Sequence, residues 1–588
     1  LREEKMQDEQ CFTIVQAWLA RLEKALRSEE LNELTACFDK DSHWRDLVAF
    51  TGTISPFRGA DEISNGLYSF QKKIKARSFE LLDKHAAPRL VARLGQSVIE
   101  AIFTFETEWG WGEGVVRLLE KSPKTAWTFL TTLKELKGFE EKVGSLRPSG
   151  EAYSRNFGGS NWLDQRQHSV KFSDREPTVL VVGGGQAGLA VAARLGQLEI
   201  ETLVIDKHDR VGDNWRKRYH SLALHNQIHV NHLPYLPFPP TWPKYIPKDM
   251  LANWFELYAE AMQINFWTGS ELVNAKYNSS SKHWIAVVRQ NNNTERVLNP
   301  KHIIFANGVS GIPYKPELDG LSDFEGEVLH SEGFSNGIEW TGKRAAVLGT
   351  GNSGHDVAQD LQSHGVYTSI IQRGSSTVVS IDPSAKLNYA LYDEGASLED
   401  SDLIASVATY PLIVKGYQLA VKKMAEFDKE LIAGLKKRGF KYDLGEDFTG
   451  HQMKYRRRGG GYYLDAGCSK LIIDGKIQLL QFDDIDRFVD NGILMKNGNI
   501  EEIDLLVLAT GYHSQTELVS RLLGNNIAKK VGQIWGIGED GEMANMWKAT
   551  PQKGLWFMAG SLAQCRIYSK YLAMQIKMIE ENLSLKNL

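Results

Sequence analysis

The chain has 588 residues, of which 42% are hydrophobic and 24% are charged, a balance that is typical of a globular protein and excludes a mainly disordered or fibrous one. Its formal net charge of −4 gives no reason to expect nucleic acid or an anionic membrane as a partner. The four scattered cysteines exclude a disulfide scaffold and indicate a reducing compartment, which we expect to be the cytoplasm. No segment has the ~20 apolar residues that a transmembrane helix needs.

The first 145 residues predict an α+β domain in which helices precede antiparallel strands. Apolar side chains at helical spacing predict an amphipathic helix over 12–26, and a second short helix follows it. A glycine-rich stretch at 110–114 is typical of a turn between strands. The strands are expected at 98–107, 115–119 and 125–133.

The region from residue 177 onward alternates strands and helices, which is the pattern of a doubly wound α/β fold. Residues 146–176 before it are rich in turn-forming residues and predict a linker. One unit then occurs twice, as an apolar strand, a G-x-G-x-x-G loop and a helix. Such glycines allow a tight turn and a close approach of the backbone to a pyrophosphate, so we predict two dinucleotide-binding domains. The glycines are Gly183, Gly185 and Gly188 in the first loop and Gly349, Gly351 and Gly354 in the second.

The residue that follows the second strand of each unit distinguishes the two ligands. Asp206 in the first unit is placed to accept hydrogen bonds from the ribose hydroxyls of a dinucleotide. The second unit has Gln372 at the matching position, followed by Arg373, whose guanidinium would bind a ribose phosphate. We therefore expect the second site to prefer NADP over NAD. Two dinucleotide sites in one chain indicate hydride transfer between cofactors, with a flavin as the natural partner of NADP.

Further motifs make residues 177–577 resemble the flavin-containing monooxygenases. Residues 324–334 match F-x-G-x-x-x-H-x-x-x-[FY], the identifying motif of that family, and lie between the two glycine-rich loops, as they do in its members. The sequence Ala-Thr-Gly-Tyr at 509–512 resembles a late element of the family. The stretch from 224 to 239 is similar to the flavin-facing segment of YUCCA-type and bacterial members. The N-terminal region is similar to a SnoaL-like domain, a cone-shaped α+β fold.

This resemblance implies a fold and a division of the chain. The fold class is α/β, with two Rossmann-like dinucleotide-binding domains, for FAD and NADP, preceded by the SnoaL-like α+β domain at 1–145. The FAD-binding domain is expected to comprise 177–335 and 498–588. The NADP-binding domain is expected at 336–497 and to contain a helical insertion.

The resemblance also implies roles for individual residues. The residues assigned to FAD are Gly183, Gly185, Gly188, Asp206, Trp215 and Arg216. Those assigned to NADP are Gly349, Gly351, Ser353, Gly354 and Arg373. His330 of the identifying motif is expected to link the two cofactor sites, and Thr510 and Gly511 of the late element are assigned to cofactor binding. His225 or Asn226 is expected to lie against the flavin and to stabilise the oxygenated intermediate, and the sequence leaves open which of them does so.

The implied activity is that of an FAD- and NADPH-dependent monooxygenase, which inserts one atom of O2 into a small organic substrate through a flavin hydroperoxide. Oxygenation at nitrogen or sulfur and oxidative decarboxylation of a 2-oxo acid both fit this class. The alternatives are a Baeyer–Villiger monooxygenase and a flavoprotein NADPH oxidase or reductase. Phe334 argues against the first, because those enzymes usually have tryptophan at this position of the motif.

Three other sequence patterns could indicate a metal site, an anion-binding site or a redox disulfide. Four histidines lie between residues 220 and 232, but the prolines around them and the lack of a nearby carboxylate argue against a metal site, and we expect none. The basic run at 454–458 is typical of a solvated loop, with the NADP phosphates or an anionic substrate as alternative partners. A disulfide reductase would need paired cysteines, whereas Cys468 and Cys565 are far apart in the sequence. We expect no nucleic-acid partner, and a homodimer is left open.

Overall fold

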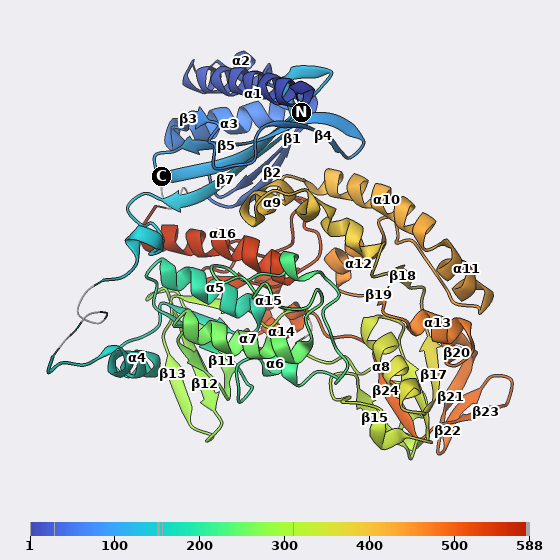
Figure 1. Cartoon of the computed structure of the whole chain (residues 1–588). Helices are drawn as coiled ribbons and strands as arrows, with labels where there is room; N and C mark the ends of the chain where they lie inside the picture. The colour runs from blue at the N-terminus through green and yellow to red at the C-terminus, as the bar shows by residue number, and fades with distance from the viewer. Residues whose placement is uncertain are drawn as a thin grey trace.

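The computed structural model describes residues 2–28, 30–149, 153, 155, 157–309 and 311–583, with side chains from residue 9 onward. Its N-terminal domain lies on one side of two α/β units (Figure 1). The strands of this domain form a mixed sheet in the order β2-β1-β7-β6-β5-β3, with β4 paired to β5. The elements are α1 (Arg2–Ser28), α2 (Leu31–Thr35), β1 (Phe38–Leu47), β2 (Ile54–Arg58), α3 (Ala60–Ile74), β3 (Arg77–Glu80), β4 (Arg89–Arg93), β5 (Gln96–Glu106), β6 (Gly110–Leu119) and β7 (Ser122–Leu136). The predicted α+β class is confirmed, but the predicted order of helices before antiparallel strands was wrong, because α3 follows β2 and β1 pairs with β7 in parallel. The SnoaL-like resemblance stays a prediction.

Strand β6 contains the glycines for which the sequence predicted a turn, so that prediction was wrong. A Cβ atom at Gly112 would lie 2.2 Å from the ring of Phe105, and one at Gly114 would lie 2.3 Å from the ring of Phe103, both on the neighbouring strand β5. The two rings cover these positions of the sheet. The glycines therefore allow close packing within a strand, not a reversal of the chain.

The predicted linker contains a helix that the sequence did not reveal. Helix α4 (Trp162–Lys171) begins at a capping box between Asn161 and Asp164, and it follows the short 3-10 turn η1 (Gly144–Leu146). The indole of Trp267 donates to the backbone oxygen of Val170 at 2.7 Å and so attaches α4 to the first α/β unit. Because α4 buries none of its side chains, it has no apolar periodicity by which the sequence could predict it.

The first α/β unit is built on a parallel sheet in the order β10-β9-β8-β14-β25. Helix α16 packs along α5 on one face of this sheet (Figure 1). An antiparallel sheet, β11-β12-β13, connects β10 to β14. The elements are β8 (Val179–Val182), α5 (Gln186–Gln197), β9 (Thr202–Ile205), α6 (Asp213–Arg216), η3 (Ile228–Val230), α7 (Lys248–Ala261), β10 (Phe266–Trp267), β11 (Ser270–Asn278), β12 (His283–Gln290), β13 (Glu295–Leu298), β14 (His302–Phe305), α14 (Gln515–Leu523), α15 (Asn525–Val531), β25 (Leu555–Phe557) and α16 (Leu562–Glu580).

The second α/β unit is built on a parallel sheet in the order β15-β24-β16-β17-β20. Its elements are η4 (Leu321–Asp323), β15 (Glu327–His330), η5 (Ile338–Trp340), β16 (Arg344–Leu348), α8 (Asn352–Ser363), β17 (Tyr367–Gln372), α13 (Cys468–Ile473), β20 (Gln478–Gln481), η7 (Phe482–Asp484), β21 (Ile485–Val489), β22 (Gly492–Met495), β23 (Ile500–Glu502) and β24 (Leu505–Leu508).

Strands β15 and β24 lie in this second sheet, whereas the sequence-based division assigned both to the FAD-binding part. The pairing of β15 with β24, and of β24 with β16, moves them to the NADP-binding part. The strand pattern alone does not specify the partner of a strand, because pairing is decided by the tertiary fold. The identifying motif consequently contains β15, and the late Ala-Thr-Gly-Tyr element follows the neighbouring strand β24.

The helical insertion lies between the N-terminal domain and the second α/β unit (Figure 1). It is enclosed in the sequence by the paired strands β18 (Thr377–Ser380) and β19 (Tyr462–Asp465). Its elements are η6 (Ala385–Asp393), α9 (Leu398–Ala405), α10 (Tyr410–Phe427), α11 (Lys429–Lys437) and α12 (Gly450–Arg458).

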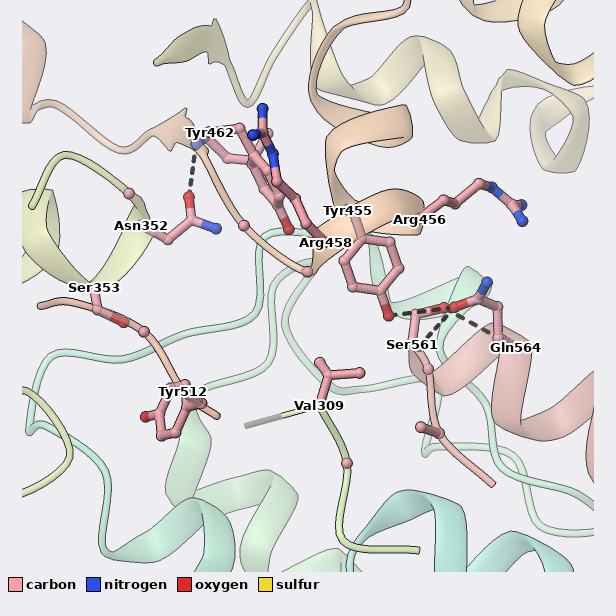
Figure 2. A pocket seen from close by; sticks show the side chains of 18 of the residues that line it. Val309, Asn352, Ser353, Tyr455, Arg456, Arg458, Tyr462, Tyr512, Ser561 and Gln564 are labelled. Atoms are coloured by element: carbon pink, nitrogen blue, oxygen red, sulfur yellow. Dashed lines mark hydrogen bonds between the residues drawn. The ribbon is translucent and has the colours of Figure 1, made fainter. Parts of the chain in front are cut away.

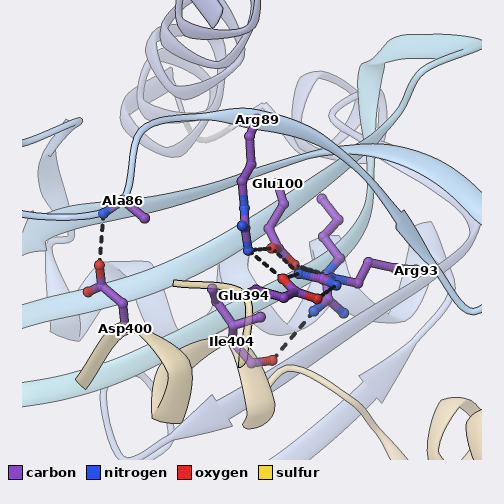
Figure 3. Close-up of polar contacts among 8 residues, drawn as sticks. Ala86, Arg89, Arg93, Glu100, Glu394, Asp400 and Ile404 are labelled. Carbon is purple, nitrogen blue, oxygen red and sulfur yellow. Dashed lines mark hydrogen bonds and ion pairs between the residues drawn. The ribbon is translucent and has the colours of Figure 1, made fainter. Parts of the chain in front are cut away.

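A network of charges that is centred on the buried Glu100 joins the N-terminal sheet to this insertion (Figure 3). Glu100 on β5 accepts hydrogen bonds from Arg93 at 2.6 Å and from Arg117 at 2.9 Å. Arg93 also pairs with Glu394, which follows η6, at 2.6 Å. Burial of Glu100 opposes its negative charge, but the guanidinium groups of Arg93 and Arg117 outweigh that effect and lower its pKa to about 2. Each charge in the network therefore has a partner of opposite sign.

We expect the substitution Glu100→Gln to lower the free energy of unfolding by about 3 kcal/mol, because it leaves buried guanidinium groups without their carboxylate. The matched control is Glu502→Gln, whose ion pair with Arg344 is exposed and should contribute less than about 1 kcal/mol. Urea denaturation followed by fluorescence measures both. Since the pKa of Glu100 is depressed, its stabilising contribution is complete above its ordinary value of 4.5 and is lost as the pH falls toward about 2. Equal effects of the two substitutions would contradict the prediction.

Candidate functional site

A cavity of about 2840 Å³ is lined by both α/β units and by the helical insertion. Gly183 and Gly185 of the first glycine-rich loop line it, and so do Gly349 and Gly351 of the second. The two predicted dinucleotide sites thus face one space, as hydride transfer between two bound cofactors requires.

The first glycine-rich loop leaves no room for side chains. Gly183 has a φ of +110°, and a Cβ atom there would lie 2.7 Å from the backbone oxygen of Ala306. At Gly188 a Cβ atom would lie 2.0 Å from the oxygen of Gly183, so helix α5 packs directly on the turn. Asp206 lines the cavity, and its Oδ2 accepts a hydrogen bond from the backbone nitrogen of Gly184 at 2.7 Å. The carboxylate is therefore fixed beside the loop, where it could receive ribose hydroxyls.

The second glycine-rich loop repeats this geometry at the start of α8. Gly349 has a φ of +125°, and a Cβ atom at Gly354 would lie 2.0 Å from the oxygen of Gly349. Gly351 is the N-cap residue of α8, and Ser353 and Gly354 line the cavity beside it. Each loop thus presents backbone N–H groups and a helix N-terminus to the cavity, and the residues present fit two dinucleotides.

Gln372 and Arg373, at the end of β17, have different environments. Gln372 is buried, and its amide donates to the backbone oxygen of Lys441 at 2.9 Å and accepts from the nitrogen of Lys441 at 2.7 Å. Arg373 is exposed and lines the cavity, and its guanidinium makes no hydrogen bond or ion pair with any residue that the structure describes. It is thus free to bind a phosphate at this edge of the sheet.

We expect Arg373→Gln to raise the KM for NADPH about 10- to 100-fold and to leave the KM for NADH nearly unchanged, because only NADPH has a ribose phosphate for the guanidinium to bind. Steady-state oxidation of the two nucleotides measures the ratio. Arg487→Gln is the control, since Arg487 is an exposed arginine of the same unit that does not line the cavity. An unchanged NADPH-to-NADH preference in the Arg373 variant would refute this assignment.

The two residues predicted at the second FAD-contacting element point in different directions. Trp215 lines the cavity and donates from its indole to Oε1 of Gln186 at 3.2 Å. Arg216 does not line the cavity; it forms an ion pair with Asp213 and donates to Oδ1 of Asn253 at 3.2 Å. Direct cofactor contact by Arg216 is therefore not supported by its position, because its guanidinium holds α6 in place.

His330 connects the identifying motif to the late element. Its Nε2 donates to the backbone oxygen of Gly511 at 3.1 Å, and its Nδ1 accepts from the nitrogen of Glu332 at 3.2 Å. Burial lowers the pKa of His330, which favours the neutral imidazole that this pair of bonds requires. Thr510 and Gly511 line the cavity, whereas His330 does not. The histidine thus holds a cavity-lining segment in place and does not itself reach the cavity.

His225 and Asn226 both line the cavity. The amide of Asn226 donates to the hydroxyl of Tyr389, on η6 of the insertion, at 3.3 Å. His225 makes no hydrogen bond within the described part of the chain, and burial lowers its pKa to about 4. Its imidazole is therefore neutral at neutral pH and retains one donor and one acceptor.

The sequence reasoning missed the residues that close the cavity from the insertion and from α16. Figure 2 shows Tyr455, on α12, directed toward Ser561 and Gln564. The hydroxyl of Tyr455 donates to Oε1 of Gln564 at 3.4 Å, and Ser561 and Gln564 form the capping box of α16. The S-x-x-Q pattern at 561–564 was the available signal, since it marks a helix N-terminus.

One part of the cavity, here called the chamber, is enclosed by the insertion, the C-terminal segment and the N-terminal domain. Residues that line it are Leu94, Tyr389, Leu412, Tyr417, Arg456 and Tyr568. Arg45 of β1 also lines the cavity, and its guanidinium forms two hydrogen bonds of 2.7 Å with Glu542. The N-terminal domain is therefore part of the chamber wall.

The described residues give little support to a redox cysteine pair or a metal site. Cys468 and Cys565 are buried, burial raises the pKa of both thiols, and neither lines the cavity. The described residues contain no group of three or more His, Cys, Asp or Glu side chains that could hold a metal ion. Within the same residues, none of the helices combines the length and the apolar character that crossing a membrane requires.

Comparison with known proteins gives a family match and several curated relatives. The family described as pyridine nucleotide-disulphide oxidoreductase matches residues 180–408. Probable indole-3-pyruvate monooxygenase YUCCA8 of Arabidopsis thaliana is 29% identical over 340 residues, which cover 57% of this chain and 74% of the relative. Indole-3-pyruvate monooxygenase YUCCA1 of Oryza sativa subsp. japonica is 27% identical over 340 residues, which cover 58% and 77%.

The fold also matches a solved structure. The epsilon-caprolactone-bound crystal structure of cyclohexanone monooxygenase in the Loose conformation has a TM-score of 0.50 and 18% sequence identity, and the match covers 69% of this chain and 88% of that one. At this level of identity the likeness shows a shared fold.

Proposed function

We propose that this flavin-dependent monooxygenase, which uses FAD and NADPH, takes a 2-oxo acid as its substrate and decarboxylates it oxidatively. The observation that carries the proposal is the chamber, which is part of the cavity that both nucleotide loops line and which is itself lined by the aromatic side chains Tyr389, Tyr417 and Tyr568. The printed names of the curated relatives, monooxygenases of indole-3-pyruvate, add support from outside this chain. Oxygenation at nitrogen or sulfur is the second candidate, because the aromatic lining also suits an uncharged amine or sulfide.

The two glycine-rich loops would hold the cofactors. The loop of Gly183 and the carboxylate of Asp206 would bind FAD, and the loop of Gly349 with Arg373 would bind NADPH. The flavin, when bound, supplies the activation of O2 and the transfer of one oxygen atom. The protein contributes orientation, hydrogen bonds and a space from which bulk water is excluded.

The overall reaction balances without a further reagent. The 2-oxo acid loses its carboxyl group as CO2, and one atom of O2 enters the shortened carboxylic acid. The second oxygen atom leaves as water, and NADPH with one proton supplies the two electrons and the hydrogen. The oxidant and the reductant are those of the monooxygenase class itself.

His225 and Asn226 would have different tasks at the flavin. The neutral imidazole of His225 has both nitrogens free of protein partners within the described residues, so it can hydrogen-bond to a bound group in the cavity. The amide of Asn226 is bonded to Tyr389 and would position the insertion against the flavin segment. We propose His225 as the residue that contacts the oxygenated cofactor and Asn226 as a positioning residue.

The reaction is tested by supplying the holoenzyme with phenylpyruvate, NADPH and 18O2. We expect one 18O atom in phenylacetate, with CO2 and NADP formed in equal amounts. Conversion of amines or sulfides to oxygenated products, without turnover of 2-oxo acids, would favour the second candidate. Hydrogen peroxide as the main product with every substrate would instead indicate an NADPH oxidase.

We expect His225→Ala to lower the yield of oxygenated product per NADPH about 10- to 100-fold, with a matching rise in hydrogen peroxide, because one hydrogen bond to the bound intermediate is lost. Since the pKa of His225 is about 4, this yield should not vary between pH 6 and pH 8 through its titration. Product and peroxide are measured together. The control is His364→Ala, a partly exposed histidine at the C-cap of α8 that does not line the cavity. A full yield in the His225 variant would refute the role.

We expect the double substitution Cys468→Ser and Cys565→Ser to keep NADPH turnover within about twofold of the unsubstituted enzyme at a temperature where both are folded, because both thiols are buried away from the cavity. NADPH oxidation in air measures this directly. Complete loss of turnover by a folded variant would revive a disulfide-reductase mechanism.

A cytoplasmic location stays a prediction of the sequence, and the sequence leaves a homodimer open. Sedimentation of the purified protein and fractionation of its source cells would test them separately.

A further inference from the structure

Helix α12 carries three consecutive arginines, and their partners differ. Arg457 pairs with Asp447 at 2.6 Å, and Arg458 pairs with Glu446 at 3.3 Å. Arg456 forms no ion pair with a carboxylate in the described part of the chain. Its Nε donates to the hydroxyl of Tyr417 at 3.0 Å, and among the described residues neither Nη atom has an acceptor.

Arg456 faces the chamber rather than the nucleotide loop. It lines the cavity, and Figure 2 shows it pointing away from the loop that carries Asn352 and Ser353. Burial raises the pKa of the Tyr389 hydroxyl, and the positive charge of Arg456 opposes that rise, so the two side chains are neighbours. Tyr389 in turn accepts a hydrogen bond from Asn226. Arg456 thus stands one side chain away from the residues that we assign to the flavin.

The other charges of the chamber cancel. Arg45 of β1 and Glu542 of the C-terminal segment form a bidentate pair that is buried. The guanidinium of Arg456 is therefore the net positive charge among the described residues that line the chamber. A cation that is shielded from water and has no carboxylate partner is costly unless a ligand supplies the missing anion.

We propose that Arg456 binds the carboxylate of the substrate through its two free Nη atoms. The guanidinium presents parallel donors that match the two oxygens of a carboxylate, and the surrounding tyrosines would contact an aromatic or apolar body. This assignment rests on the proposed function for its choice of substrate, and it makes Arg456 the residue that selects acids over neutral molecules of the same shape. The prediction of a solvated loop at 454–458 was wrong, because these residues lie on α12 and Lys454 is buried.

The test is a binding titration of the FAD holoenzyme that requires no turnover. The probes are 3-phenylpropanoate and its uncharged amide, 3-phenylpropanamide, each followed through the flavin absorbance spectrum. We expect the carboxylate to bind at least about 10-fold more tightly than the amide, and Arg456→Gln to weaken carboxylate binding about 10- to 100-fold with the amide unaffected. Arg456→Lys keeps the charge and should recover part of the loss. Arg457→Gln removes a charge from the same helix outside the cavity lining and should change neither affinity.

Several outcomes would overturn the assignment. One is that the unsubstituted enzyme binds the carboxylate and the amide with equal affinity. Another is that a folded Arg456→Gln enzyme loses affinity for both probes to the same extent. A parallel titration with NADP is expected to give the same Kd for both enzymes, and a weaker NADP complex in the variant would assign Arg456 to a cofactor phosphate. Failure of the 18O2 experiment, with the carboxylate preference retained, would contradict the proposed reaction and leave the binding site standing.

Discussion

The structure depends on the close approach of backbone to backbone at two strand-to-helix turns. At Gly188 and at Gly354 an added Cβ atom would lie 2.0 Å from the oxygen of the first glycine of the same loop. Only glycine allows α5 and α8 to start so close to their strands, and only this closeness directs both helix N-termini into one cavity. The other walls of the cavity are arranged around these two turns.

Two motif residues outside the glycine-rich loops do not line the cavity themselves. Arg216 holds α6 through Asp213, and His330 holds the segment of Gly511 through its neutral imidazole. Both side chains were assigned to cofactor binding by resemblance, yet each positions a neighbour that does line the cavity, such as Trp215 or Thr510. A motif residue can therefore be required by the site without touching a ligand.

Networks of ion pairs, and not only the linker, join the N-terminal domain to the rest of the chain. Arg45 reaches Glu542, and Glu100 is linked through Arg93 to Glu394. Removal of one partner from such a buried network leaves an uncompensated charge, so the networks fix the domain in one orientation. Since Arg45 and Leu94 line the cavity, this orientation also shapes the space available to the substrate.

The sequence by itself determined the two dinucleotide units, because the glycine spacing after an apolar strand follows from local backbone geometry. It also separated the ligands locally, through Asp206 in one unit and Arg373 in the other. Only the tertiary structure decided that β15 and β24 belong to the second sheet, that 110–114 is a strand, and that Arg456 faces the chamber without a carboxylate. Strand partners, ring packing and ion pairs join residues that are distant in the sequence, and a local pattern contains no information about which distant residue will be the partner.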